Sequence, residues 1–275
     1  MPSFNYGAHT FGFAWTLAAD ETFSALGNAG FKTVQLMATP PHFDPWKEDH
    51  GRTRRLRAFI EQYGMAVIAL DLASSDINLA SPADDVVDFA VLSYERAIER
   101  GAELGARAIC VGSGRRHPLL PNVNLRLMNG YRRAFARIRD TALRHGQQVL
   151  LENHPLGLLA DAGAIESFLA SEGDDNTAVI YDVANAFAAG EDPVDGLAAL
   201  ARRIDVVHLS DAPTGQWRHD PIGSGDIDFA AITAALRRAN FAGDVVLEIL
   251  SDNPLEDLTK GIAIVEAAAT KAAAL

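Results

Sequence analysis

The chain has 275 residues, of which 48% are hydrophobic and 22% charged, as in ordinary soluble globular proteins. Its formal net charge of −12 would repel a phosphate backbone, so we expect no nucleic-acid partner. No run is long enough to span a membrane and the N-terminus MPSFNYGAHT has no signal-peptide pattern, so we expect no membrane partner and a cytoplasmic location.

Short apolar runs and helical patterns alternate along the whole sequence. Runs rich in β-branched residues predict buried parallel strands. Between them lie amphipathic patterns such as RTRRLRAFIEQYG and LRLMNGYRRAFARIRDTALRHG, and several of these end at glycine, which is favoured just after a helix. The predicted strands occupy residues 4–9, 33–37, 66–71, 107–112, 147–152, 178–182, 205–209 and 244–249.

Eight strands, each followed by a helix, predict an α/β fold of the (β/α)8 TIM barrel type. No linker or low-complexity segment interrupts the alternation, so residues 1–275 are interpreted as a single domain. An open doubly wound sheet is the alternative fold. It is disfavoured because the first strand is followed by GAHTFGFAW and not by a glycine-rich GxGxxG turn.

Four of the later strands end on side chains that bind metals. These residues are Glu152, Asp182, His208 and Glu248, spaced by about one strand–helix unit. The carboxyl ends of barrel strands carry the active site, so the four side chains are expected to converge there. Three carboxylates and an imidazole would repel one another without a cation. We therefore expect one divalent ion, manganese first, with magnesium, cobalt or zinc as alternatives.

Four further residues are candidates for substrate binding. His154 shares the strand-end face with Glu152, and Asn185 follows Asp182 by three positions. Arg218 lies on the long loop after the seventh strand, and Trp15 stands in an aromatic cluster after the first. The alternatives are loop packing for His154 and hydrophobic closure of the barrel for Trp15. Asp182 taken alone is equally consistent with a helix N-cap.

The segments LLENHP, YDVANAF, IDVVHLSDA, IGSGDIDF and VVLEI occur in an order and spacing similar to those of the xylose-isomerase-like TIM barrels. This superfamily includes sugar isomerases, ketose 3-epimerases and inosose dehydratases. The resemblance implies that Glu152, Asp182, His208 and Glu248 hold the metal. It also implies that Glu152 and Glu248 act as the acid/base pair.

The function expected from this resemblance is a metal-dependent isomerase or epimerase of a sugar or keto-polyol. The reaction would remove a proton next to a carbonyl and pass through an enediolate. The alternative is a lyase or dehydratase acting on a keto-sugar, an inosose or a 3-dehydroshikimate-like substrate. A remote alternative is a nuclease similar to endonuclease IV, but those enzymes carry a histidine where this chain has Asn185. A homo-oligomer is a possible assembly.

Overall fold

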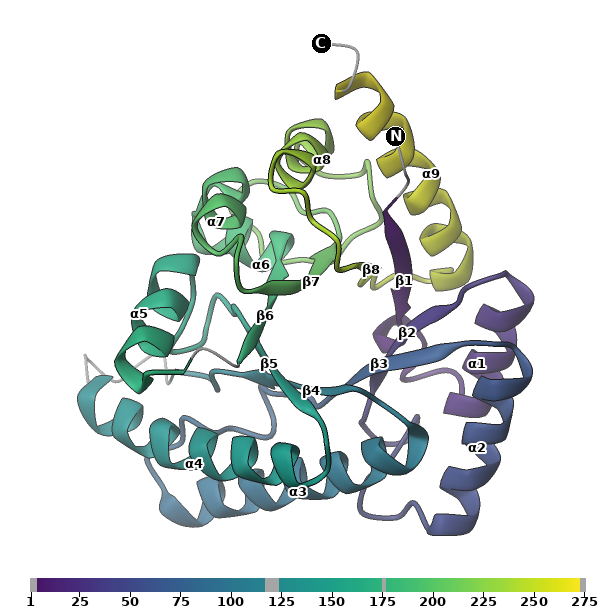
Figure 1. Cartoon of the computed structure of the whole chain (residues 1–275). Coiled ribbons are helices and arrows are strands. Elements are labelled where there is room, and N and C mark those ends of the chain that lie inside the picture. The colour runs from purple at the N-terminus through teal and green to yellow at the C-terminus, as the bar shows by residue number, and fades with distance from the viewer. Residues whose placement is uncertain (1–3, 117–123, 175–176, 273–275) are drawn as a thin grey trace.

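The computed structural model describes residues 4–116, 124–174 and 177–272. Its strands form one closed parallel barrel in which each strand pairs with its neighbours in sequence and β8 closes on β1. Figure 1 shows the barrel strands at the centre and the helices around them. The predicted (β/α)8 TIM barrel is confirmed. The strands are β1 (Asn5–His9), β2 (Thr33–Met37), β3 (Ala66–Asp71), β4 (Ala108–Gly112), β5 (Gln148–Glu152), β6 (Ala178–Asp182), β7 (Ile204–Leu209) and β8 (Asp244–Leu247).

The two helical patterns quoted from the sequence, residues 52–64 and 125–146, correspond to α2 and α4. Gly105 ends α3 with φ +81, a left-handed backbone conformation that glycine adopts without strain. The structure adds a short helix, α6, directly after β6. The helices are α1 (Ala19–Asn28), α2 (His50–Gln62), α3 (Asp84–Leu104), α4 (Asn124–Arg144), α5 (Ala162–Glu172), α6 (Val183–Ala189), α7 (Pro193–Ala199), α8 (Phe229–Arg238) and α9 (Pro254–Ala272), with a 3-10 turn at Phe11–Phe13.

Two separate apolar cores follow from the alternation of side chains along the strands. On β7, Val207 and Leu209 belong to the outer core between strands and helices, whereas Val206 belongs to the inner core. His208 therefore points inward, one layer above Val206. The inner core consists of Ile68, Ala69, Ala108, Cys110, Leu150, Ile180, Val206 and Val246.

The opposite, amino-terminal end of the barrel is closed by polar contacts. Arg107, just before β4, forms ion pairs with Asp205 on β7 and with Asp244 on β8, the latter at 2.7 Å. Asn5 on β1 donates a second hydrogen bond to Asp244. These contacts connect strands on different sides of the barrel.

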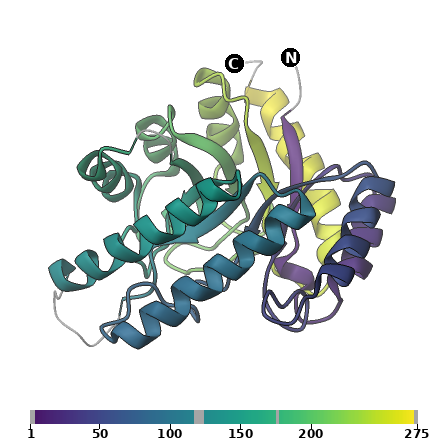
Figure 2. The same cartoon turned by 60° about the horizontal axis from the view of Figure 1, so that its bottom comes forward.

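Helices α3 and α4 run side by side on one flank, as the turned view in Figure 2 shows.

In the described part of the chain, no helix combines the length and the apolar character needed to cross a membrane.

Candidate metal centre

The four side chains expected to bind a metal come together at the carboxyl end of the barrel. Each offers one ligand atom, and these atoms all lie within 4.8 Å of one another. Glu152 and Asp182 are the last residues of β5 and β6, His208 lies in β7, and Glu248 directly follows β8. All four are buried. Parallel pairing sets Asp182 opposite His208, so backbone register places their side chains together.

His208 lies at the centre of the cluster. Its Nδ1 atom is 3.1 Å from Glu152 Oε1, 3.0 Å from Glu248 Oε2 and 3.6 Å from Asp182 Oδ2. Neither His208 Nδ1 nor Asp182 Oδ2 has a hydrogen-bond partner, although both atoms are buried. Buried polar atoms are nearly always satisfied. The two unsatisfied atoms and the carboxylates around them therefore fit a divalent cation.

Asp182 can serve both as a helix N-cap and as a metal ligand, because its two carboxylate oxygens have different surroundings. Its Oδ1 atom accepts a hydrogen bond of 2.7 Å from the backbone N–H of Asn185 and so caps α6. Its Oδ2 atom points into the cluster and stays without a partner. The cap fixes the carboxylate in one orientation, which leaves the second oxygen available to an ion.

The two glutamates differ in their electrostatic surroundings. Burial raises the pKa of Glu152 to about 7, against the lowering effect of His208. Burial also acts to raise the pKa of Glu248, but the attraction of His9, His219 and His208 outweighs it and holds that pKa well below its ordinary value. One carboxyl group therefore takes up a proton near neutral pH far more readily than the other.

Two inward-facing residues at the ends of earlier strands extend the polar layer. His9 ends β1 and its Nε2 lies 3.2 Å from Asp71 Oδ2 at the end of β3, while His9 Nδ1 lies 4.0 Å from Glu248 Oε1. Sequence reasoning missed both residues. The signal was present, because each is a polar residue at a strand end, as the four expected ligands are.

His219 also reaches the cluster, from the loop after β7. Its Nδ1 is 3.0 Å from Ser210 Oγ and 3.9 Å from both Asp182 Oδ2 and Glu248 Oε2. Spacing could not assign this position, because the loop returns to the barrel through backbone contacts between Asp211 and Asp220 and between Leu250 and His219.

His154 and Asn185 both contact the indole of Trp217. The ring of His154 packs edge-on against Trp217 with centroids 4.8 Å apart, and Asn185 Oδ1 accepts a hydrogen bond of 2.7 Å from Trp217 Nε1. Asn185 Nδ2 donates to the Asn153 carbonyl at 3.0 Å, which leaves its amide engaged at both ends. His154 and Asn185 thus meet at Trp217, on the loop after β7.

Arg218 and Trp15 are both largely exposed. Arg218 forms a two-pronged ion pair with Asp220, at 2.6 and 2.7 Å, and its side chain is 55% exposed. Trp15 is 66% exposed. Substrate binding by these two residues stays a prediction.

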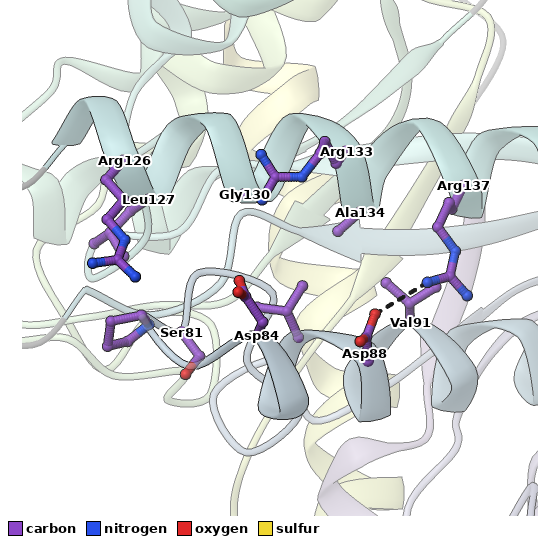
Figure 3. Close-up of a pocket in the computed structure, with 12 residues that line it drawn as sticks. Ser81, Asp84, Asp88, Val91, Arg126, Leu127, Gly130, Arg133, Ala134 and Arg137 are labelled. Carbon is purple, nitrogen blue, oxygen red and sulfur yellow. Dashed lines mark hydrogen bonds and ion pairs between the residues drawn. The ribbon is translucent and has the colours of Figure 1, made fainter.

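A groove of about 370 Å³ between α3 and α4 lies outside the barrel and shares no residue with the ligand cluster. Figure 3 shows basic side chains of α4 facing acidic side chains of α3, including the ion pair of Arg137 with Asp88 at 3.2 Å. The groove is lined by acidic and basic side chains, whereas the ligand cluster inside the barrel consists of three carboxylates and one imidazole.

The model of the xylose isomerase-like TIM barrel family matches residues 23–268. The chain belongs to this family, and the expected resemblance is confirmed.

Similar proteins carry two kinds of name. A protein named probable endonuclease 4 from Mycobacterium ulcerans (strain Agy99) is 26% identical, over 83% of this chain and 89% of its own length. A ketose 3-epimerase from Arthrobacter globiformis is 25% identical, over 86% of this chain and 79% of its own length. Among solved structures, a D-tagatose 3-epimerase-like protein has a TM-score of 0.84 at 18% identity and 98% coverage of both chains. An L-ribulose 3-epimerase has a TM-score of 0.80 at 22% identity, covering 98% of this chain and 96% of its own.

Proposed function

We propose that this protein is a metal-dependent isomerase or epimerase that moves a proton next to the carbonyl of a sugar or keto-polyol. The observation that carries the proposal is the set of three carboxylates around His208 Nδ1, with Asp182 Oδ2 also lacking a partner. The name of the relative from Arthrobacter globiformis supports the substrate class.

Glu152, Asp182, His208 and Glu248 would hold the ion. Mixed carboxylate and imidazole donors suit manganese first, and also magnesium, cobalt or zinc. When bound, the ion would supply Lewis-acid polarisation of a substrate carbonyl and its neighbouring hydroxyl. Asp182 would serve only as a ligand, because its other oxygen caps α6.

Glu152 and Glu248 would exchange protons with the substrate carbon. They extend from β5 and β8, on separated parts of the barrel rim, so they can approach a bound substrate from different sides. Their pKa values are shifted in opposite directions, which is the usual mark of an acid/base pair with divided roles. The glutamate that removes the proton and the one that returns it would depend on the epimer bound.

The test is proton exchange in deuterated water. The purified protein would be stripped of metal, reloaded with Mn²⁺ or Mg²⁺, and incubated with a panel of ketoses, inososes and keto-glycosides while NMR follows each substrate. Metal-dependent deuterium incorporation with the carbon skeleton intact supports the proposal. Absence of exchange across the panel by a protein that binds metal would contradict it.

A lyase acting through the same proton removal is the second candidate, and His219 is the observation that favours it. Its ring lies 3.9 Å from the carboxylates of Asp182 and Glu248, where an imidazole can protonate a leaving hydroxyl. The same NMR experiment separates the two reactions, because a lyase releases water or an aglycone and leaves a new double bond.

A nuclease has less support, despite the names of several relatives. The amide of Asn185 is engaged by Asn153 and Trp217, so it does not present a free ligand atom to a further ion. The net charge of −12 also works against binding a nucleic-acid backbone. Cleavage of DNA containing abasic sites by the zinc-loaded protein would reverse this order.

A further inference from the structure

Gln35 contacts the central imidazole from the far side of the barrel. It lies in the middle of β2, fully buried, and its Oε1 is 2.9 Å from His208 Nε2. Val34 and Leu36 on either side belong to the outer core, so alternation directs Gln35 inward. Sequence reasoning did not single out this residue.

The backbone holds Gln35 firmly in place. It pairs with His9 of β1 and Ala69 of β3, and its carbonyl accepts a hydrogen bond of 3.0 Å from Thr10. The side-chain Nε2 has no partner, which carries a desolvation cost in a buried position. An apolar residue of similar size would avoid that cost. The contact with His208 is therefore what the Gln35 amide contributes and an apolar side chain would lack.

An oxygen can only accept a hydrogen bond, so the contact requires the proton on His208 Nε2. The opposite nitrogen, Nδ1, then directs its lone pair toward Glu152, Asp182 and Glu248. The reversed amide would donate to Nε2 and move the proton to Nδ1, where it would block an ion. The orientation of one amide thus decides whether His208 can act as a ligand.

We propose that Gln35 is a positioning residue that fixes the Nε2–H tautomer and the ring orientation of His208, and thereby presents Nδ1 to a divalent cation. The inference rests on the proposed metal-dependent function, since it assigns how one ligand of that site is prepared. Gln35 would act through its contact with His208.

The experiment compares Gln35→Met, Gln35→Glu and Gln147→Met with the wild type. Methionine keeps the length of the side chain but removes the acceptor, whereas glutamate restores it. Gln147 is the matched control, because it is also buried and donates one hydrogen bond of 2.9 Å, to the Ile98 carbonyl, away from the ligands. Zn²⁺ affinity is measured by competition with a chelator, and ¹⁵N NMR of the histidine rings reports which nitrogen carries the proton.

We expect Gln35→Met to weaken Zn²⁺ binding by about 10- to 100-fold and to shift the His208 Nε2–H signal, because that proton loses its acceptor. Gln35→Glu should retain both. Gln147→Met should lower the melting temperature of the metal-free protein but leave Zn²⁺ affinity and the His208 signal unchanged. Wild-type affinity in Gln35→Met, or a wild-type proton on Nδ1 in the zinc-loaded protein, would overturn the proposal.

Failure of the proposed function would look different. A wild-type protein that binds no metal would refute the metal-dependent enzyme. The metal-free spectra would still decide the role of Gln35, because the Nε2–H signal must then be present in the wild type and Gln147→Met and altered in Gln35→Met. An identical signal in all variants would refute the positioning role by itself.

Discussion

Trp217 Nε1 donates a hydrogen bond of 2.7 Å to Asn185 Oδ1, which ties the loop after β7 to the helix that follows β6. The loop is held at its base by Asp211, a buried residue whose carboxylate accepts hydrogen bonds from the backbone of Ala212, Gly223 and Ile227. Trp217 is 43% exposed, so part of its side chain is open to solvent.

The first prediction concerns this indole. Trp217→Ala should raise the KM for a sugar substrate by about 10-fold, since it removes an aromatic wall, while metal affinity stays unchanged. The KM of Trp217→Phe should lie between the KM of Trp217→Ala and that of the wild type. Trp46→Phe is the matched control, because Trp46 stacks on Phe89 and donates to Ser93 on α3. Equal KM values for Trp217→Ala and the wild type would exclude a contact with substrate.

The second prediction separates the two glutamates. Glu152→Gln and Glu248→Gln each keep an oxygen ligand but lose basicity, so turnover should fall by about 100-fold or more with metal still bound. Each variant should still exchange the substrate proton with solvent from one epimer while failing to convert it into the other. Near-normal turnover in both variants with metal bound would mean that another group, such as His154 or His219, carries the proton.

The third prediction is that metal affinity increases with pH. Protons compete with the ion for Glu152, whose pKa is raised to about 7 by burial, and for His208. Burial lowers the pKa of His208, but the close carboxylates of Asp182, Glu152 and Glu248 outweigh this effect and raise that pKa well above its ordinary value. The logarithm of the affinity should therefore rise by about two per pH unit below pH 7 and about one above it.

Calorimetric titration with Mn²⁺ between pH 6 and 8.5 checks this. Glu152→Gln should reduce the slope below pH 7 to about one, because one competing proton is gone. In the metal-free protein, the contribution of Glu152 to stability should change with pH in the opposite direction. Folding raises the pKa of Glu152, so its contribution is present below the unfolded pKa and is lost as the pH rises to about 7. A pH-independent affinity would argue against both groups as ligands.

The fourth prediction tests the amino-terminal end of the barrel. Arg107→Met should destabilise the fold by about 1–2 kcal/mol, because Asp244 is largely buried and would lose its cation. Urea unfolding measures the loss, which should shrink at high salt. Arg57→Met, which breaks an exposed pair with Glu61, should cost less. Neither change should affect metal affinity. A large drop in the metal affinity of Arg107→Met would show that the two ends of the barrel are coupled.

Strand positions were accessible from the sequence because each buried strand is a short β-branched run. The predicted span 178–182 equals β6 as observed, and 66–71 equals β3. The helix α6 was missed because its seven residues, VANAFAA, are too few to show a helical period. Asp182 before it and Gly190 after it were the available signals, as N-cap and left-handed C-cap.

Strand-end reasoning found the four clustered side chains but not the residues that face them. Gln35 lies in mid-strand, and a glutamine in an apolar run carries no sign of which imidazole it meets across a barrel. The guanidinium of Arg218 forms hydrogen bonds with Asp220, two residues further along the chain. Which partner Arg218 binds depends on how the loop folds. Contacts between distant segments need the closed barrel, which local patterns do not specify.

The inner core also limits the routes by which an ion and a substrate would enter and leave the site. Cys110, Leu150 and Val206 are fully buried and belong to the apolar layer inside the barrel, which lies below the ligand cluster. For the proposed function, an ion bound by the four side chains would enter and leave through the mouth of the barrel, and a substrate seated above it would block that passage. We therefore expect ordered binding, with the ion arriving before the substrate and departing after the product.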